Sequence, residues 1–182
     1  QELQTDEGIE RARRIEAKMV QPDEDNMLAV CTYMTKVALD ARIIDPEAEE
    51  YDGGKVALCA EKIIEINKAN PGTAQAVFCD TNTPKKDAFS VYQALRERLV
   101  RSDEFAENEI AFVHDAANDK QRLAMFEKVN NAEIKIIIGS TGKLGTGVNI
   151  QRKLSALHHL DAPYRPSDIE QRNGRGIRQG NE

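Results

Sequence analysis

Two kinds of apolar spacing divide the chain. In residues 1–50, apolar side chains recur every three or four positions, a period typical of helices that bury one face. We therefore expect a helical extension whose apolar stripes pack on a domain. The stripes consist of Ile9, Ala12, Ile15 and Met19, and of Met27, Val30, Met34, Val37, Ala41 and Ile44.

Residues 51–182 follow a different pattern, in which short continuous apolar runs alternate with amphipathic helical segments. Continuous apolar strands separated by helices are typical of a parallel sheet covered on both faces. The sequence thus predicts an α/β domain. Strands are expected over 74–79, 110–114, 134–139 and 155–161, and helices over 55–68, 89–100 and 119–129, the last with Leu123, Phe126 and Val129 aligned.

The polar loops after these strands are the candidate binding loops, because ligands of open parallel sheets gather at the carboxyl ends of the strands. They cover residues 80–84, 114–118 and 140–149, and the segment from 161 onward.

The glycine-rich loop after the third expected strand fits neither of two familiar nucleotide-binding patterns. A P-loop needs G-x-x-x-x-G-K-[ST], but the Gly142-Lys143 pair is accompanied by Ile137 and Leu144 where a glycine and a hydroxyl residue are required. The dinucleotide fingerprint G-x-G-x-x-G fails at its third glycine, which is Ile150 here. The loop is suited to contacting phosphate, but it is not one of the familiar nucleotide-binding loops.

Composition indicates a globular, acidic chain with 40% hydrophobic residues, 31% charged residues and a net charge of −6. No apolar run approaches the roughly 18 residues of a membrane span, and the polar first residues show no signal peptide. We expect no membrane contact and a cytoplasmic location. The chain begins with Gln and stops within QGNE, which suggests a piece of a longer protein.

Cysteines and histidines give no sign of a metal site. The three cysteines are scattered, odd in number and set among apolar residues, which is typical of buried free thiols in a reducing compartment. The histidines lack zinc spacing with them, so we expect no metal, and we expect the histidine pair to pack within its strand. The residues are Cys31, Cys59, Cys79, His114, His158 and His159.

The last 17 residues combine a helix start with a basic cluster. Ser167 and Glu170 have capping-box spacing just after Pro166, which predicts a helix beginning there. Between residues 171 and 180 there are three arginines and no acidic residue. Such planar, permanently charged donors suit a polyphosphate.

One face of that helix would present Gln171, Arg175 and Arg178, if the helix continues past Gly174 and Gly176. On these residues the chain resembles a known family. The segment QRNGRGIRQGN is similar to motif VI of superfamily 2 helicases, especially the Swi/Snf-type translocase form Q-x-x-x-R-x-x-R-x-G-Q, with Asn181 in place of the last Gln.

Upstream segments resemble other motifs of the same family in the same order. Residues 140–151 are similar to motif V, residues 75–84 to the motif IV strand and loop, and residues 114–130 to the strand, loop and helix before motif V. The likeness runs from Lys55 to Asn181 and is greatest to helicase modules of large phage or mobile-element proteins that also carry DNA methyltransferase domains.

The resemblance implies a RecA-like second lobe, with its parallel sheet sandwiched by helices, over residues 51–182. In such motors ATP with Mg²⁺ lies between two lobes and is bound mainly by a first lobe of the same polypeptide, which supplies the P-loop. This chain lacks that P-loop, so we expect it to be inactive in isolation. By resemblance, Arg175 and Arg178 are arginine fingers, and Gln171, Gly147 and Asn149 face the nucleotide.

The resemblance also implies contacts to a nucleic acid, which we expect to be double-stranded DNA. The candidates are Thr141, Lys143, Thr81 and Asn82. Ordinary local roles stay open: Lys143 could be a solvent-facing loop residue, and Thr81 and Asn82 could cap a helix.

Three other functions stay open. Residues 161–164, DAPY, resemble the [DNS]-P-P-[YFW] loop of DNA amino-methyltransferases, although Ala162 replaces the first Pro and no glycine-rich cofactor loop accompanies it. A non-catalytic module that binds nucleic acid or a partner is the second. A nucleotide kinase is the third, and the missing P-loop argues against it.

Overall fold

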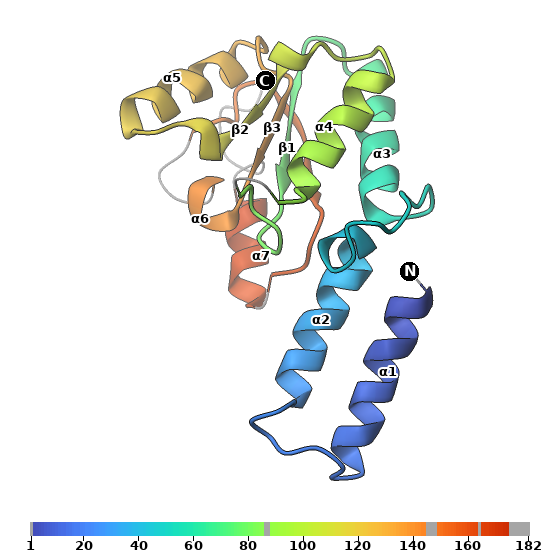
Figure 1. Cartoon of the computed structure of the whole chain (residues 1–182). Coiled ribbons are helices and arrows are strands. Elements are labelled where there is room, and N and C mark those ends of the chain that lie inside the picture. The colour runs from blue at the N-terminus through green and yellow to red at the C-terminus, as the bar shows by residue number, and fades with distance from the viewer. Residues whose placement is uncertain (1, 86–87, 145–148, 164, 175–182) are drawn as a thin grey trace. The chain divides into compact units, whose positions relative to one another are not determined.

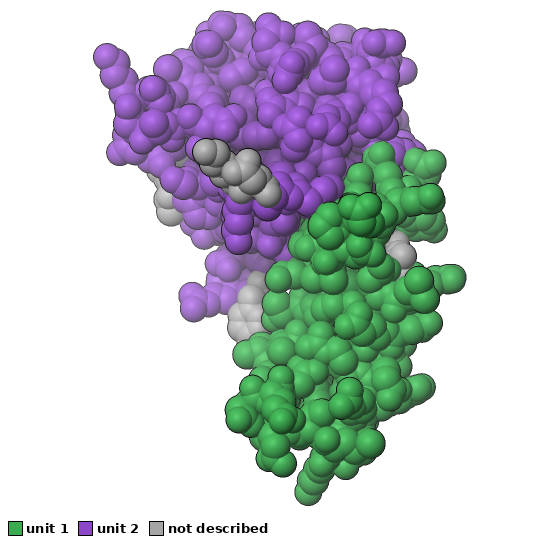
Figure 2. Space-filling view, viewed as in Figure 1, with its two compact units in different colours: residues 1–55 green, residues 56–182 purple. Residues whose placement is uncertain are grey.

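The computed structural model describes residues 2–85, 88–144, 149–163 and 165–174. The chain forms two compact units, Gln1–Lys55 and Val56–Glu182, coloured separately in Figure 2. No helix in the described part of the chain is long and apolar enough to cross a bilayer.

The first unit is a pair of helices, α1 (Glu2–Glu16) and α2 (Met27–Leu39), followed by the short 3-10 helix η1 (Ala41–Ile43) (Figure 1). Asn26 caps α2, because its side-chain oxygen accepts a hydrogen bond from the amide of Ala29. The helical extension predicted from the sequence is confirmed.

The buried faces of these helices differ from the predicted stripes. Gly8 is the buried residue of α1 and lies directly against Met34 of α2, where a side chain would collide with the Met34 sulfur. The close approach at Gly8 turns Ile9 toward solvent, at 42% exposure. Met19 lies beyond the helix and Met27 is at the start of α2, and both are exposed.

The second unit contains a four-stranded sheet in which all neighbours are parallel, in the order β2-β3-β1-β4 (Figure 1). The central strands β1 and β3 are buried along their whole length. The predicted RecA-like α/β fold is therefore confirmed. The strands are β1 (Ala74–Phe78), β2 (Ile110–Phe112), β3 (Ile136–Gly139) and β4 (Leu154–His159).

Helices cover both faces of this sheet (Figure 1). On one face lie α3 (Lys55–Ala69) and α4 (Val91–Arg101): Gln75 of β1 donates to the Ile63 carbonyl oxygen, and the Tyr92 hydroxyl donates to the Cys79 carbonyl oxygen. On the other face, α5 (Asp119–Asn130) packs Phe126 into a cluster with the alternate residues of β1.

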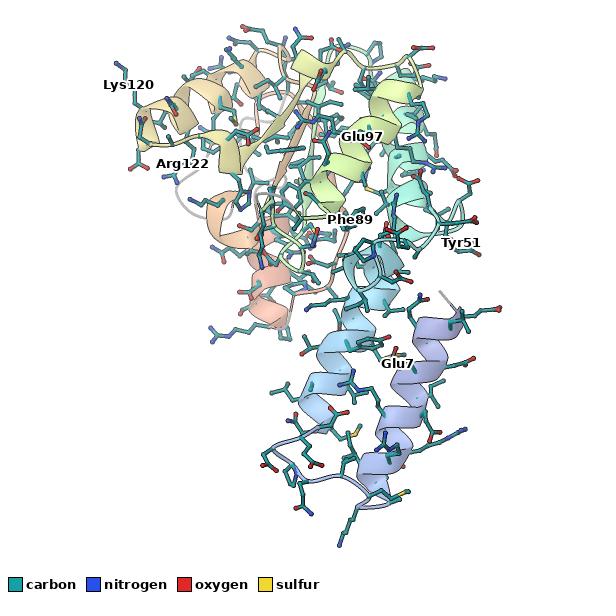
Figure 3. The ribbon with its side chains drawn as sticks, in the orientation of Figure 1. Glu7, Tyr51, Phe89, Glu97, Lys120 and Arg122 are labelled. Carbon is teal, nitrogen blue, oxygen red and sulfur yellow. The ribbon has the colours of Figure 1, made fainter. Side chains whose placement is uncertain are left out.

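Two residues that were predicted to be buried are exposed. Leu123 is 61% exposed, because the first turn of α5, with Lys120 and Arg122, projects away from the sheet (Figure 3). Cys31 is exposed because its neighbour Val30 takes the buried position on α2, whereas Cys79 is buried as expected.

Short helices complete the unit. The 3-10 helix η2 (Glu107–Glu109) leads into β2, whereas η3 (Val113–Asp115), α6 (Thr141–Leu144) and α7 (Pro166–Asn173) follow the carboxyl ends of strands. Helix α7 begins one residue before the predicted start, with Pro166 in its first turn and no side-chain cap, so the predicted Ser167 capping box is wrong.

A polar cluster at the strand ends as the candidate functional site

Four side chains converge at the carboxyl edge of the sheet. Asp80 follows β1, Thr141 opens α6 directly after β3, and Asp161 follows β4. Because the strands are parallel, these positions meet at the same edge. Arg172 of α7 reaches into their midst.

Arg172 is fully buried and its guanidinium donates to each of the other three residues. Nε donates to the Thr141 hydroxyl oxygen at 2.7 Å, and Nη1 to the Asp161 carbonyl oxygen at 2.9 Å. Nη2 bridges the carboxylates of Asp80 and Asp161 at 2.6 and 3.1 Å. The group also lies 5.3 Å from the ring centre of Phe78. One side chain thus fastens α7 to the ends of three strands.

The two carboxylates are satisfied by further donors. The second oxygen of Asp161 accepts from the amides of Asp80 and Thr81, both at 2.6 Å, and from the Thr81 hydroxyl at 2.7 Å. Asp80 accepts from the Thr141 amide at 2.7 Å and from its hydroxyl at 2.6 Å. A buried charge is tolerated when it is paired and fully hydrogen-bonded in this way.

The cluster combines one guanidinium with two carboxylates, and the two aspartates differ in exposure. The Asp80 side chain is 37% exposed and that of Asp161 only 4%. Burial raises the pKa of Asp80, but hydrogen bonds from Thr141 and Arg172 lower it by more, so this pKa lies below its ordinary value. Asp80 is therefore an anion at the solvent-facing side of the cluster.

The four nucleic-acid candidates from the sequence differ in whether their side chains are engaged within the protein or exposed. Thr81 is held by Asp161, and Asn82 supports the start of α4 by accepting from the Val91 amide at 2.7 Å. Lys143 is exposed on α6 at the carboxyl end of β3. Thr141 belongs to the cluster, with its hydroxyl between Asp80 and Arg172.

The nucleotide-facing candidates are only partly within the described residues. Gln171 is exposed on α7, and Asn149 is exposed with its carbonyl oxygen accepting from the Asn130 side chain at 2.8 Å. Gly147, Arg175 and Arg178 lie outside the described residues, as do Tyr164, Gly176, Gly180 and Asn181.

Gly139, the first glycine of the glycine-rich loop, has a packing role. A side chain at this position would collide with Leu144, whose Cγ would lie 2.7 Å from the added carbon, and would press on Val113 at 3.1 Å. The glycine at the end of β3 lets α6 fold back and bury Leu144, which places Thr141 beside Asp80.

The two histidines of β4 have different surroundings. Burial lowers the pKa of His158 to about 4, and the ring shares a 2.8 Å hydrogen bond with the Gln75 side-chain oxygen. His159 stacks on Phe78 and meets Asn173 of α7 at 2.9 Å. In β4 the pair therefore points to opposite faces, one ring toward Gln75 and the other toward α7.

His114, at the end of β2, has a lowered pKa because it is partly buried and near Lys143. Its ring stands edge-on to Tyr92, and its Nδ1 has no hydrogen-bond partner among the described residues. In the described part of the chain, no three His, Cys, Asp or Glu side chains are grouped so as to hold a metal.

The buried thiols are unsuited to nucleophilic chemistry. Burial raises the pKa of Cys59 and that of Cys79 to about 12. Since the thiolate is the reactive form, both remain unreactive at neutral pH.

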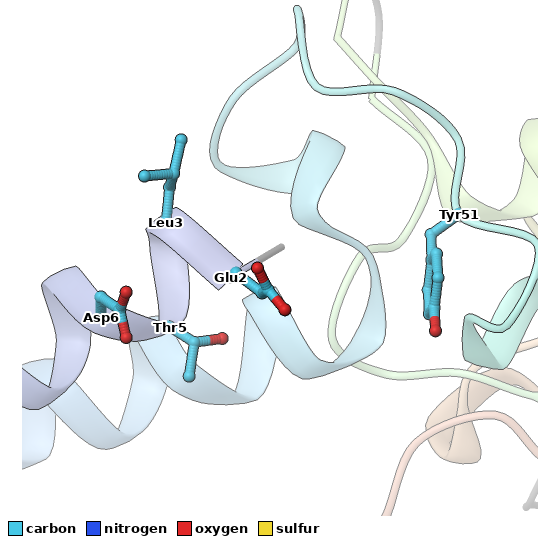
Figure 4. A pocket seen from close by; sticks show the side chains of 5 residues that line it. All are labelled: Glu2, Leu3, Thr5, Asp6 and Tyr51. Carbon is cyan, nitrogen blue, oxygen red and sulfur yellow. The ribbon is translucent and has the colours of Figure 1, made fainter.

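A separate hollow of about 780 Å³ lies in the first unit (Figure 4). Among the described residues, its lining carries two carboxylates and no basic side chain, which does not suit a phosphate-bearing ligand. The lining residues are Glu2, Leu3, Thr5, Asp6 and Tyr51.

The fold and the strand-end cluster define a RecA-like α/β lobe. Residues 55–180 match the helicase conserved C-terminal domain, and the chain belongs to this family. The predicted superfamily 2 helicase C-terminal domain is thereby confirmed. The chain is also 29% identical over 146 residues to the "Defense against restriction protein B" of Escherichia phage P1, a match that covers 76% of this chain and 6% of that protein.

Sequence reasoning missed Arg172 and its two aspartates as a unit. A signal was available: Asp80, Thr141 and Asp161 each follow a predicted strand, so two carboxylates should meet at one edge and need a cation. The basic segment of residues 171–180, which follows the last of these strand ends in the sequence, supplies it.

Proposed function

We propose that this chain is the second motor lobe of an ATP-dependent nucleic-acid helicase or translocase of the Swi/Snf-like type, and that it supplies motifs IV, V and VI. The observation that supports this best is the Arg172 cluster, which ties the motif VI helix α7 to the strand ends that carry motifs IV and V. Three motifs separated in sequence share one hydrogen-bonded unit.

Arg175 and Arg178 are the proposed arginine fingers. They follow Arg172 by three and six residues in the sequence, and Arg172 itself lies at the edge of the sheet where ligands of such folds bind. During hydrolysis, negative charge spreads over the γ-phosphoryl oxygens, and guanidinium groups delivered across the lobes stabilise it. Such fingers contribute about 10³- to 10⁵-fold in rate.

ATP and Mg²⁺ are held mainly by a first lobe of the same polypeptide in this proposal, while Gln171, Gly147 and Asn149 face the nucleotide. Without that lobe the chain hydrolyses no ATP. The small share of the phage relative that it matches, 6%, supports a module within a larger protein.

Double-stranded DNA is the proposed track, contacted through Thr141, Lys143, Thr81 and Asn82. The printed name of the phage relative concerns defense against restriction, a process that acts on DNA, and this favours DNA over RNA. Contacts to phosphates give a grip that is sensitive to salt and independent of sequence. A DNA methyltransferase domain elsewhere in the same polypeptide is part of this proposal.

The test replaces the fingers in the polypeptide that carries both lobes. Arg175→Ala and Arg178→Ala should each lower the DNA-stimulated rate of ATP hydrolysis about 10³-fold or more, without lowering the thermal midpoint. Arg13→Ala is the matched control, because that arginine is 74% exposed on α1, and it should leave the rate unchanged. Full activity in both finger variants contradicts the assignment.

The same assay separates the motor from a module that only binds. A two-lobe protein that binds DNA yet hydrolyses no ATP would support the binding module, and Arg175→Ala would then change nothing but DNA affinity.

A further inference from the structure

The carboxylate of Asp80 occupies both donors of Thr141 that the proposed motor assigns to a DNA phosphate. The Thr141 amide donates to one Asp80 oxygen at 2.7 Å, and its hydroxyl donates to the other at 2.6 Å. A carboxylate held by two donors of one residue resembles a phosphate held by the same pair.

A phosphate cannot share these donors with Asp80. An amide and a hydroxyl each have one proton to give, and both protons point to the carboxylate. Two anions at this spacing also repel each other. A DNA phosphate therefore reaches Thr141 only after Asp80 has moved off.

We propose that Asp80 sets the affinity of this lobe for DNA by competing with a backbone phosphate for the amide and hydroxyl of Thr141. The inference rests on the proposed function, since it requires Thr141 to be a DNA contact. It makes Asp80 a residue that weakens DNA binding, although it lies within the interface.

Asp80 is suited to this exchange and Asp161 is not. Asp161 is 4% exposed and is fixed by backbone amides, whereas Asp80 is 37% exposed. When Asp80 leaves Thr141 it keeps the Arg172 Nη2 donor at 2.6 Å, so its charge stays paired. Because Arg172 belongs to α7, the exchange links DNA binding at motif V to the helix of motif VI.

The experiment measures the binding of this chain to a short fluorescent DNA duplex by anisotropy, at about 50 mM and about 200 mM salt. Asp80→Asn keeps the shape and removes the charge, and it should bind about tenfold more tightly, the worth of one charge-assisted hydrogen bond. Thr141→Val should bind more weakly than the unmodified chain. The double variant Asp80→Asn/Thr141→Val should show a smaller gain over Thr141→Val, because the backbone amide remains for the phosphate but the hydroxyl does not.

Asp115→Asn is the matched control for net charge. Asp115 is an exposed carboxylate that follows β2, so it lies at the same edge of the sheet and its removal changes the total charge equally. It should alter affinity less than about twofold, because salt screens an exposed charge. An equal gain in Asp115→Asn, an unchanged or weaker affinity in Asp80→Asn, or a gain of undiminished size without the Thr141 hydroxyl overturns the inference.

The outcomes separate the inference from the proposed function. If Thr141→Val weakens binding but Asp80→Asn does not strengthen it, only the inference fails. If the duplex binds to no form of the chain, both fail. Thermal midpoints of all variants ensure that binding is measured on folded protein.

The exchange can also be measured on the unmodified chain, so that the result does not depend on whether a variant folds. In amide NMR spectra, adding the duplex should move the Thr141 resonance, whose hydrogen bond to Asp80 is exchanged, and leave that of Gln75, whose amide bonds to the Lys135 carbonyl oxygen near the start of β1. Equal shifts at both amides, or none at Thr141, contradict the exchange.

Discussion

Each unit contains an arginine that binds aspartate, but the two arginines do different work. In the first unit, Arg11 of α1 donates through Nε and Nη2 to both oxygens of Asp25, each at 2.8 Å. These side chains keep 27% and 17% of their surface exposed, whereas Arg172 in the second unit has none. Arg11 joins a helix to a nearby turn, while Arg172 joins segments up to 92 positions apart.

The difference shows how the setting of an ion pair decides its importance. A partly exposed pair gains little, since water competes for both partners and salt screens them. A buried pair with every lone pair satisfied is costly to assemble, yet removing one member leaves a desolvated charge. The Arg172 cluster therefore determines where α7 lies, and the Arg11 pair supports only the contact between α1 and the turn before α2.

The largest expected effect is that of Arg172→Met, which leaves Asp161 buried without its cation. We expect a loss of about 3–5 kcal/mol in the free energy of unfolding, measured by urea denaturation. The double variant Arg172→Met/Asp161→Asn should recover part of the loss, because the more deeply buried of the two unpaired carboxylates is then neutral. If Arg172→Met lowers the free energy of unfolding no more than Arg11→Gln does, the two arginines contribute alike to stability and the contrast between them is wrong.

The next largest effect is the change of stability with pH that arises from His158, whose partly buried ring is hydrogen-bonded to Gln75. Burial lowers the pKa of folded His158 to about 4, below the ordinary value of 6.5 that applies to the unfolded chain. The unfolded state then binds more protons between these values, so stability falls as pH drops from 6.5 toward 4. His158→Gln should flatten this slope.

His114→Gln is the comparison for that experiment, because its pKa is also lowered and it should remove a smaller part of the slope. Unfolding midpoints in urea across this pH range provide the measurement. The first unit contains no histidine, so its helices add no such slope. An unchanged slope in His158→Gln would show that the ring takes up its proton alike in the folded and unfolded chain, and would contradict the lowered pKa.

The smallest effect is expected for Arg11→Gln. The loss of stability should be a small fraction of that for Arg172→Met and should shrink further at high salt, because the pair is reached by water. Urea denaturation at low and high salt measures both. A salt-independent loss would mean that the Arg11–Asp25 contact is effectively buried.

The sheet could be predicted from sequence because its central strands are continuous apolar runs. In β1 and β3 every residue is buried, and the helices between them have clear apolar faces. The burial of single residues near the ends of helices was harder to predict. Leu123 has helical spacing with Phe126 but lies in the part of α5 that projects away from the sheet.

Arg172 could not be placed by the same means. Its neighbours in sequence are polar, and the helical spacing of the segment pointed to Gln171, Arg175 and Arg178 instead. Its burial depends on carboxylates from two other strand ends, which only the parallel topology brings together. Local patterns carry no information about such partners.

The most direct test of the central claim is the steady-state ATP hydrolysis of the two-lobe protein carrying Arg172→Lys, assayed with DNA below its thermal midpoint. An ammonium keeps the charge but cannot span Thr141, Asp80 and Asp161 together, so α7 and the arginines after it should shift. We predict that kcat falls about 100-fold, as for a small displacement of catalytic groups, while KM for ATP stays nearly constant. An unchanged kcat in a folded variant would contradict the claim that Arg172 positions motif VI for hydrolysis.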